Sequence, residues 1–264
     1  ADSPYAGPES GTVESLSAIT RADITGFKDR WIRPDNGEIF VVSDRPLAEI
    51  VGALNGVFGD WEAPAAAKGT KSFADAPEAA TESRIVLVHR PNSPQSFIVG
   101  GEITPFSSSD ESIVDLTNAN NALGGNFLAR LNMNLRETKG WSYGVRGGPS
   151  INEGAVAYFV QAPVQADRTG DALAEIIKEV SEFVTTRGVT DEELTRNVNN
   201  EIRQLPGQFE TSSAVLGAMQ NNVKYGRPMD YYETLADKYR GQTVESLDAA
   251  ARKAISPDRF VWVV

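Results

Sequence analysis

Two side chains near the middle of the chain, Arg136 and Tyr143, have the types and spacing needed to hydrogen-bond a reacting carbonyl group. They lie within residues 121–148, NALGGNFLARLNMNLRETKGWSYGVRGG. This stretch predicts a helix that ends near Arg136, a tight Lys-Gly turn, and a strand that starts near Trp141. Because a helix end lies close to the start of the next strand, the guanidinium and the phenol can point into one cleft and donate to a carbonyl or oxyanion. The spacing alone favours a structural alternative, since arginine suits a helix C-terminus and tyrosine is common in strands.

The counts of histidine and cysteine exclude several kinds of catalytic site. The chain has one histidine, His89, and no cysteine. It therefore has no disulfide, no cysteine-based zinc or iron–sulfur site and no thiol nucleophile, and it cannot supply two histidines to a zinc ion. We expect His89, in an apolar strand, to be structural or solvent-facing, because no nucleophile and orienting acid can be assigned to it. The carboxylates are scattered without calcium-loop spacing, so we predict no metal site in this chain.

Charge and hydropathy exclude other classes of partner. The formal net charge is −11, from 25 Lys and Arg against 36 Asp and Glu. This charge disfavours nucleic acid and anionic membranes as partners, since phosphates need a positive surface. The hydrophobic fraction of 41% is ordinary for a globular protein, and no apolar run reaches the length of a membrane span. The chain starts at Ala1 and ends within an apolar strand, so we expect it to be part of a longer polypeptide.

The N-terminal quarter predicts a helix–strand–helix segment that belongs to a larger layer. Thr20 and Asp23 form a capping box before a helix that Pro34 ends. The β-rich run Glu38–Val42 predicts a strand, and the apolar spacing in Pro46–Phe58 predicts a second helix. We assign residues 1–62 to a segment that needs a larger layer to pack against, and residues 63–83, where apolar periodicity disappears, to a linker.

Residues 84–264 predict an α+β domain. Strands and helices are segregated along this part more than they alternate, which favours a largely antiparallel sheet with helices packed on one face. The predicted strands are 84–90, 95–106, 142–145, 154–164 and 259–264, and the predicted helices include 110–123, a second one carrying Phe127, Leu128, Leu131 and Leu135, 171–186, and one opened by the Thr190 capping box.

The stretch with Arg136 and Tyr143 resembles the signature of the C-terminal domain of the pitrilysin/insulysin family of zinc peptidases, which includes the mitochondrial processing peptidases. The family pattern L-R-E-x-x-G-x-x-Y is similar to residues 135–143, LRETKGWSY, and the Arg-to-Tyr spacing matches. Residues 5–36, the strand at 38–44 and Phe58–Trp61 also resemble the family, so that the resemblance covers nearly the whole chain. The resemblance implies that residues 1–62 are the end of a preceding homologous α/β domain and that residues 84–264 are the family's C-terminal domain.

The resemblance implies a division of labour between two homologous halves. These inverzincins carry H-x-x-E-H in the zinc-binding half, and a chain with one histidine cannot contain that motif. The resemblance therefore implies that zinc lies in a partner half or subunit, and that this chain completes the cleft with Arg136 and Tyr143. The two side chains would bind a peptide or unfolded polypeptide and stabilise the oxyanion in trans, and a sheet edge would suit an extended peptide. We expect this chain alone to show no proteolysis.

The resemblance leaves two questions undecided, the alternative function as a scaffold and the cellular compartment. Some family members are inert core subunits of respiratory complexes, so a scaffold or interaction subunit is the alternative function, although a scaffold has no need of the Arg136–Tyr143 pair. Bacterial members are often exported, and the absence of cysteine permits the periplasm, so an exported location is favoured while the compartment stays undetermined.

Overall fold

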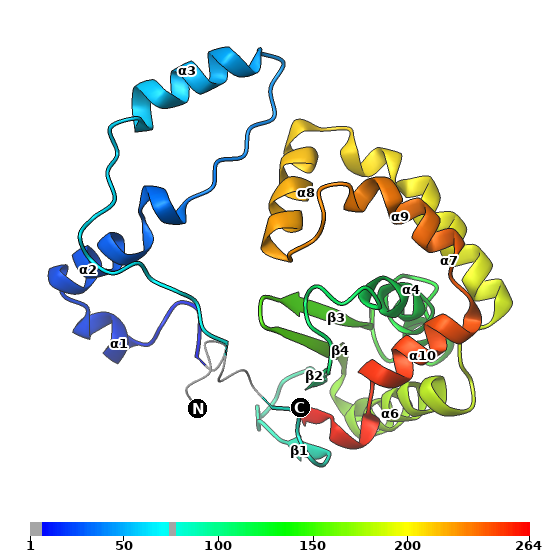
Figure 1. Cartoon of the computed structure of the whole chain (residues 1–264). Helices are drawn as coiled ribbons and strands as arrows, with labels where there is room; N and C mark the ends of the chain where they lie inside the picture. The colour runs from blue at the N-terminus through cyan, green and yellow to red at the C-terminus, as the bar shows by residue number, and fades with distance from the viewer. Residues whose placement is uncertain (1–6, 74–77) are drawn as a thin grey trace. The chain divides into compact units, whose positions relative to one another are not determined.

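The computed structural model describes residues 7–73 and 78–264 (Figure 1). Its contacts divide the chain into two compact units, one within Ala1–Ala76 and Phe209–Gln220 and the other within Pro77–Gln208 and Asn221–Val264. We call these the N-terminal unit and the sheet unit. The predicted boundaries at 62 and 83 stay a prediction. Within the described residues, no helix is both long and apolar enough to cross a membrane.

The sheet unit is built on a five-stranded sheet in the order β1-β5-β2-β4-β3. Its strands are β1 (Arg84–Val86), β2 (Gln95–Ile103), β3 (Arg146–Asn152), β4 (Ala155–Gln165) and β5 (Val261–Val263). β1 and β5 pair in parallel, and every other neighbouring pair is antiparallel. The predicted α+β class with a largely antiparallel sheet is confirmed.

Helices cover one face of this sheet. They are α4 (Ile113–Leu123), α6 (Thr169–Thr185) and α10 (Val244–Ala254), which Figure 1 draws on the same side of the strands. Every second residue of β4 from Val156 to Val164 is buried, as expected for a sheet with one covered face. The Trp262 ring packs against β2 at Gly100, where an added Cβ would lie 2.1 Å from a ring atom. The prediction that helices pack on one face of the sheet is therefore confirmed.

The remaining helices of the sheet unit form a second, smaller cluster. Helices α7 (Asp191–Gln204) and α9 (Tyr231–Arg240) pack together, with Val114, Leu205, Leu235 and Tyr239 buried between elements. The capping box predicted at Thr190 is present, since its hydroxyl accepts from the Glu193 N–H. Helix α8 (Ser212–Lys224) spans the division between the units.

Three predicted elements of the sheet unit differ from the structure. Phe127 and Leu128 were expected on a helix, but they lie in the loop before α5 (Arg130–Asn132) and are 54% and 53% exposed. The helix continues from α5 as the π-helical turn η2 (Met133–Thr138). The strand predicted at 142–145 is reduced to one bridge between Ser142 and Val164, because a turn there uses the backbone before β3 begins. The first strand ends at Val86 rather than at residue 90, although Val88 still donates to the Val264 carbonyl.

The N-terminal unit contains α1 (Val13–Ala18), α2 (Arg21–Trp31), η1 (Pro34–Asn36) and α3 (Leu47–Phe58). The predicted Thr20 capping box is present. The prediction of a strand at Glu38–Val42 is wrong: this segment is not assigned as a strand, since within the described residues no strand pairs with it and a strand needs a hydrogen-bonded neighbour. Residues 66–69 return along α2, where the buried Arg33 guanidinium donates to the Ala66 carbonyl at 2.6 Å.

Candidate functional site

The end of the helix that carries Arg136 is shaped by η2. The Lys139 N–H donates to the Asn134 carbonyl five residues back, at 2.9 Å, so the last turn is wider than an α-helical one. Gly140 then takes the left-handed conformation with φ of +66°, which closes the turn as a helix C-terminal glycine does. The Trp141 N–H donates a hydrogen bond to the Leu135 carbonyl at 2.9 Å. Single π-helical turns are frequent at functional sites, and this one fixes the position of Arg136.

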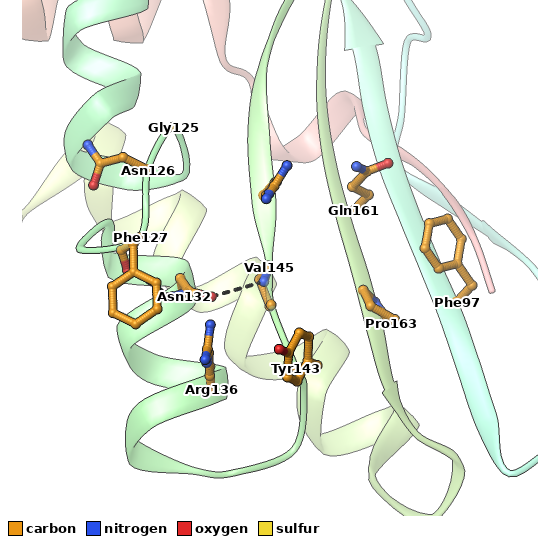
Figure 2. A pocket seen from close by; sticks show the side chains of 12 residues that line it. Phe97, Gly125, Asn126, Phe127, Asn132, Arg136, Tyr143, Val145, Gln161 and Pro163 are labelled. Atoms are coloured by element: carbon orange, nitrogen blue, oxygen red, sulfur yellow. Dashed lines mark hydrogen bonds between the residues drawn. The ribbon is translucent and has the colours of Figure 1, made fainter.

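Tyr143 is held on a short turn whose hydrogen bonds are local. The Ser142 hydroxyl donates to the Pro163 carbonyl of β4 at 2.6 Å and accepts from the Gly144 N–H at 3.1 Å. Val145, two residues on, is buried, and its N–H donates to the Asn132 side-chain oxygen at 3.2 Å (Figure 2). The backbone on both sides of Tyr143 is therefore tied down, while its side chain is 84% exposed.

Arg136 lies between two aromatic rings, as Figure 2 shows. Its guanidinium carbon is 4.7 Å from the centroid of the Phe127 ring and 5.0 Å from that of Tyr143, which are cation–π distances. Its Nε is 3.1 Å from a carboxylate oxygen of Glu137. Within the described residues, no hydrogen bond uses the terminal nitrogens of Arg136 or the Tyr143 hydroxyl. The structure thus places both predicted site residues in one cleft, with donors left for a ligand.

Asn132 and Phe127 shape this cleft, and the sequence reasoning missed both. The buried Asn132 amide donates to the Phe127 carbonyl at 2.8 Å, while its oxygen accepts from Val145. One side chain therefore links the loop that carries Phe127 to the backbone that follows Tyr143. The signal in the sequence was an asparagine between the apolar residues Leu131 and Met133, a polar residue that a buried helix face would not otherwise hold.

The cleft has a volume of about 600 Å³ and continues onto the face of the sheet that the helices do not cover. Figure 2 shows Phe97 of β2 with Gln161 and Pro163 of β4 along this side. The cleft is lined by Phe97, Gly125, Asn126, Phe127, Asn132, Arg136, Tyr143, Gly144, Val145, Arg146, Gln161 and Pro163. These lining residues include two arginines and no carboxylate, in a chain of net charge −11. The site can therefore donate hydrogen bonds to an anionic or carbonyl oxygen.

The outer edge of β3 does not offer the free backbone that an added peptide strand needs. The Gly147 N–H donates to the Gly124 carbonyl at 3.0 Å, and its carbonyl accepts from the Asn120 amide at 2.8 Å. Further along the strand, Pro149 has no N–H to donate, and the Ile151 carbonyl accepts from Tyr225 at 3.3 Å. The chain's own groups occupy this edge, which protects it from pairing with another strand.

The described residues do not fit a zinc ion. Among residues 7–73 and 78–264, no group of three or more His, Cys, Asp or Glu side chains could hold a metal. His89 is exposed and lines a separate hollow with Leu87 and Val264, in keeping with the structural or solvent-facing role predicted for it.

The fold and the cleft together define an α+β domain with a donor-lined cleft and, in its described part, no metal cluster. A profile of the peptidase M16 inactive domain matches residues 18–201, and the chain belongs to this family. It is 26% identical over 262 residues to an uncharacterized zinc protease of Mycobacterium leprae. The aligned region covers 97% of this chain and 56% of that protein.

Two solved structures share the fold. The peptidase M16 inactive domain from Pseudomonas fluorescens superposes with a TM-score of 0.84 at 23% identity, over 98% of this chain and 61% of that chain. A protease from Helicobacter pylori gives a TM-score of 0.85 at 16% identity, over 96% of this chain and 60% of that chain. The chain thus spans a little over half the length of the proteins it matches here.

Proposed function

We propose that this chain is the half of a zinc endopeptidase that binds no zinc, and that it completes the active-site cleft for a homologous zinc-bearing half. The observation that carries this proposal is the Arg136–Tyr143 pair, which keeps unused donors in a cleft lined without carboxylates. Family membership and the zinc-protease names of similar proteins support it. The partner half is either part of the same polypeptide or a separate subunit.

In this proposal, Arg136 and Tyr143 act on the carbonyl oxygen of the peptide bond that is cleaved. The terminal N–H groups of Arg136 and the Tyr143 hydroxyl donate to this oxygen and stabilise the negative charge that develops on it. Phe127 and Tyr143 hold the guanidinium from both sides, so little reorganisation is needed when charge appears. The substrate is a peptide or an unfolded polypeptide, held in the cleft without strand addition at β3.

In this proposal, residues 1–62 are the end of a preceding homologous domain, and their helices pack against the rest of that domain. Helices α1, α2 and α3 have no buried residue among those described, and several of their large apolar side chains are more than half exposed. Apolar faces of this kind mark surfaces that another domain covers.

The test is zinc analysis together with peptide cleavage, run on the chain alone, on the zinc-bearing half alone and on the two together. We expect no zinc and no cleavage for the chain alone, and cleavage by the combination that exceeds the zinc-bearing half by at least tenfold. Zinc binding and activity in the isolated chain would overturn the proposal. A stable complex with no gain in cleavage would favour the alternative, an inert scaffold of the same fold.

A further inference from the structure

A second arginine, Arg146, faces the same cleft from the sheet. It is the first residue of β3 and pairs in register with Gln161 of β4, which pairs in turn with Val99 of β2. Val145 is buried on the side of the helices, so the alternation of a strand directs Arg146 to the uncovered face. Arg146 and Gln161 both line the cleft that holds Arg136 and Tyr143.

The Arg146 side chain has no partner among the described residues, whereas several other arginines of the sheet unit are paired. Arg130 is paired with Glu193 at 2.6 Å, Arg187 with Glu182 at 2.6 Å and Arg252 with Asp248 at 3.0 Å. Within the described part of the chain, the Arg146 side chain makes no ion pair, hydrogen bond or ring contact. The Arg146 guanidinium is therefore left to bind a ligand in a cleft whose lining residues include no carboxylate.

The chemistry of the surroundings selects the ligand. A guanidinium presents its N–H groups as a planar fork that matches the two oxygens of a carboxylate. Gln161 adds a neutral amide donor beside it, and Phe97 and Pro163 give the cleft an apolar floor against which a side-chain stem can lie. The site therefore suits a carboxylate carried on a short apolar stem.

We propose that Arg146 is a specificity-determining residue that binds a carboxylate of the peptide in the cleft, so that acidic peptides are preferred. This inference rests on the proposed function, whose substrate class it names. Arg146 lies three positions after Tyr143 in the chain, which corresponds to at most about 11 Å between their Cα atoms. The carboxylate therefore lies within about three residues of the bond that Arg136 and Tyr143 address, and it is either an Asp or Glu side chain or the peptide's C-terminal group.

The test is a binding measurement that needs no turnover. Fluorescent peptides that differ only in Glu or Gln at one position, each with a free or an amidated C-terminus, are titrated onto the chain and onto the complete enzyme. We expect the carboxylate form to bind about fivefold more tightly at low salt, the size of one charge-assisted contact at an exposed site. R146Q should abolish this ratio, and R146K should keep part of it.

The control is R240Q, because Arg240 is exposed, lies on α9 and pairs with Asp237 outside the cleft. It should keep the wild-type ratio. Comparison of the Glu/Gln peptides with the free and amidated peptides shows whether Arg146 binds a side-chain carboxylate or the C-terminal one. A ratio near one in the wild type, a ratio unchanged in R146Q, or no measurable peptide binding in either form would overturn the inference. If the carboxylate preference in binding depends on Arg146 but the chain gives no gain in cleavage with the zinc-bearing half, the proposed function fails and the binding role of Arg146 stands.

Discussion

Helices α3 and α4 have similar lengths and apolar patterns, yet they differ completely in burial. Eight of the eleven residues of α4 are buried, whereas none of the twelve residues of α3 is buried in the described chain. Helix α4 packs against α10, α7 and β3 within the sheet unit. The apolar pattern of each sequence is enough to predict a helix, but the apolar side chains of that helix stabilise the fold only where another element packs against them.

The largest difference should come from truncating one large apolar side chain in each unit. Trp262 is 1% exposed and stacks on Phe260 with ring centroids 5.2 Å apart, so W262A should lower the free energy of unfolding by about 3–5 kcal/mol. Leu47 of α3 is 75% exposed, and L47A should change it by less than about 0.5 kcal/mol. Denaturant titration of both variants measures this, and equal losses would remove the distinction between the units.

Glycine-to-alanine changes should have opposite signs in the two units. At Gly100 an added Cβ would lie 2.1 Å from the Trp262 ring, so G100A should cost about 1–3 kcal/mol by overpacking. At Gly52 in α3 nothing lies within 4 Å of an added Cβ, so G52A should raise the intrinsic stability of that helix by about 0.5–1 kcal/mol. Denaturant titration reports the first change and the helical circular dichroism signal the second. Destabilisation by both would show that α3 is packed after all.

A smaller difference is expected from the pH dependence of stability. Burial raises the pKa of Glu102 in β2 to about 7, above its ordinary value of 4.5, although the Ser256 N–H donates to its carboxylate. The folded state therefore binds this proton more strongly than the unfolded chain, and stability falls as pH rises from about 4.5 to 7. We expect a loss of about 1–2 kcal/mol over this window, since one pKa unit corresponds to about 1.4 kcal/mol and the site is partly hydrated.

The variant E102Q should remove this loss, because a neutral amide oxygen still accepts from Ser256 and carries no charge to bury. The matched control is E49Q on the exposed face of α3, which should keep the wild-type pH profile. Thermal denaturation at pH 5, 6, 7 and 8 compares the three proteins. A wild-type profile in E102Q would rule out Glu102 as the source of the pH dependence.

The sequence predicted most of the architecture but not the details of the cleft. The Thr190 capping box and the periodicity of α6 depend on neighbours within one helix, so they could be recognised locally. The prediction of a strand at Glu38–Val42 failed, because a strand depends on a partner strand, and the described residues provide none there. Local pattern therefore predicts a helix more securely than a strand.

The same limit applies to the candidate site. The Arg136–Tyr143 juxtaposition follows from a helix end and the turn after it, which are local features. Arg146 enters the site only through its register with Gln161, a pairing that the sequence does not display. Phe127 was assigned to a helix because its spacing fits one, whereas Asn132 holds its loop outside the helix.

The most direct test of the proposed role of the cleft is steady-state cleavage of a peptide by the complete enzyme, this chain together with its zinc-bearing half, carrying R136Q or Y143F. The account predicts that each variant lowers kcat/KM by about 10²–10³-fold, the effect of removing one oxyanion donor, mainly through kcat. Denaturation of each variant chain should match the wild type, since both side chains act outside the core. Unchanged kcat/KM in both variants would contradict the account.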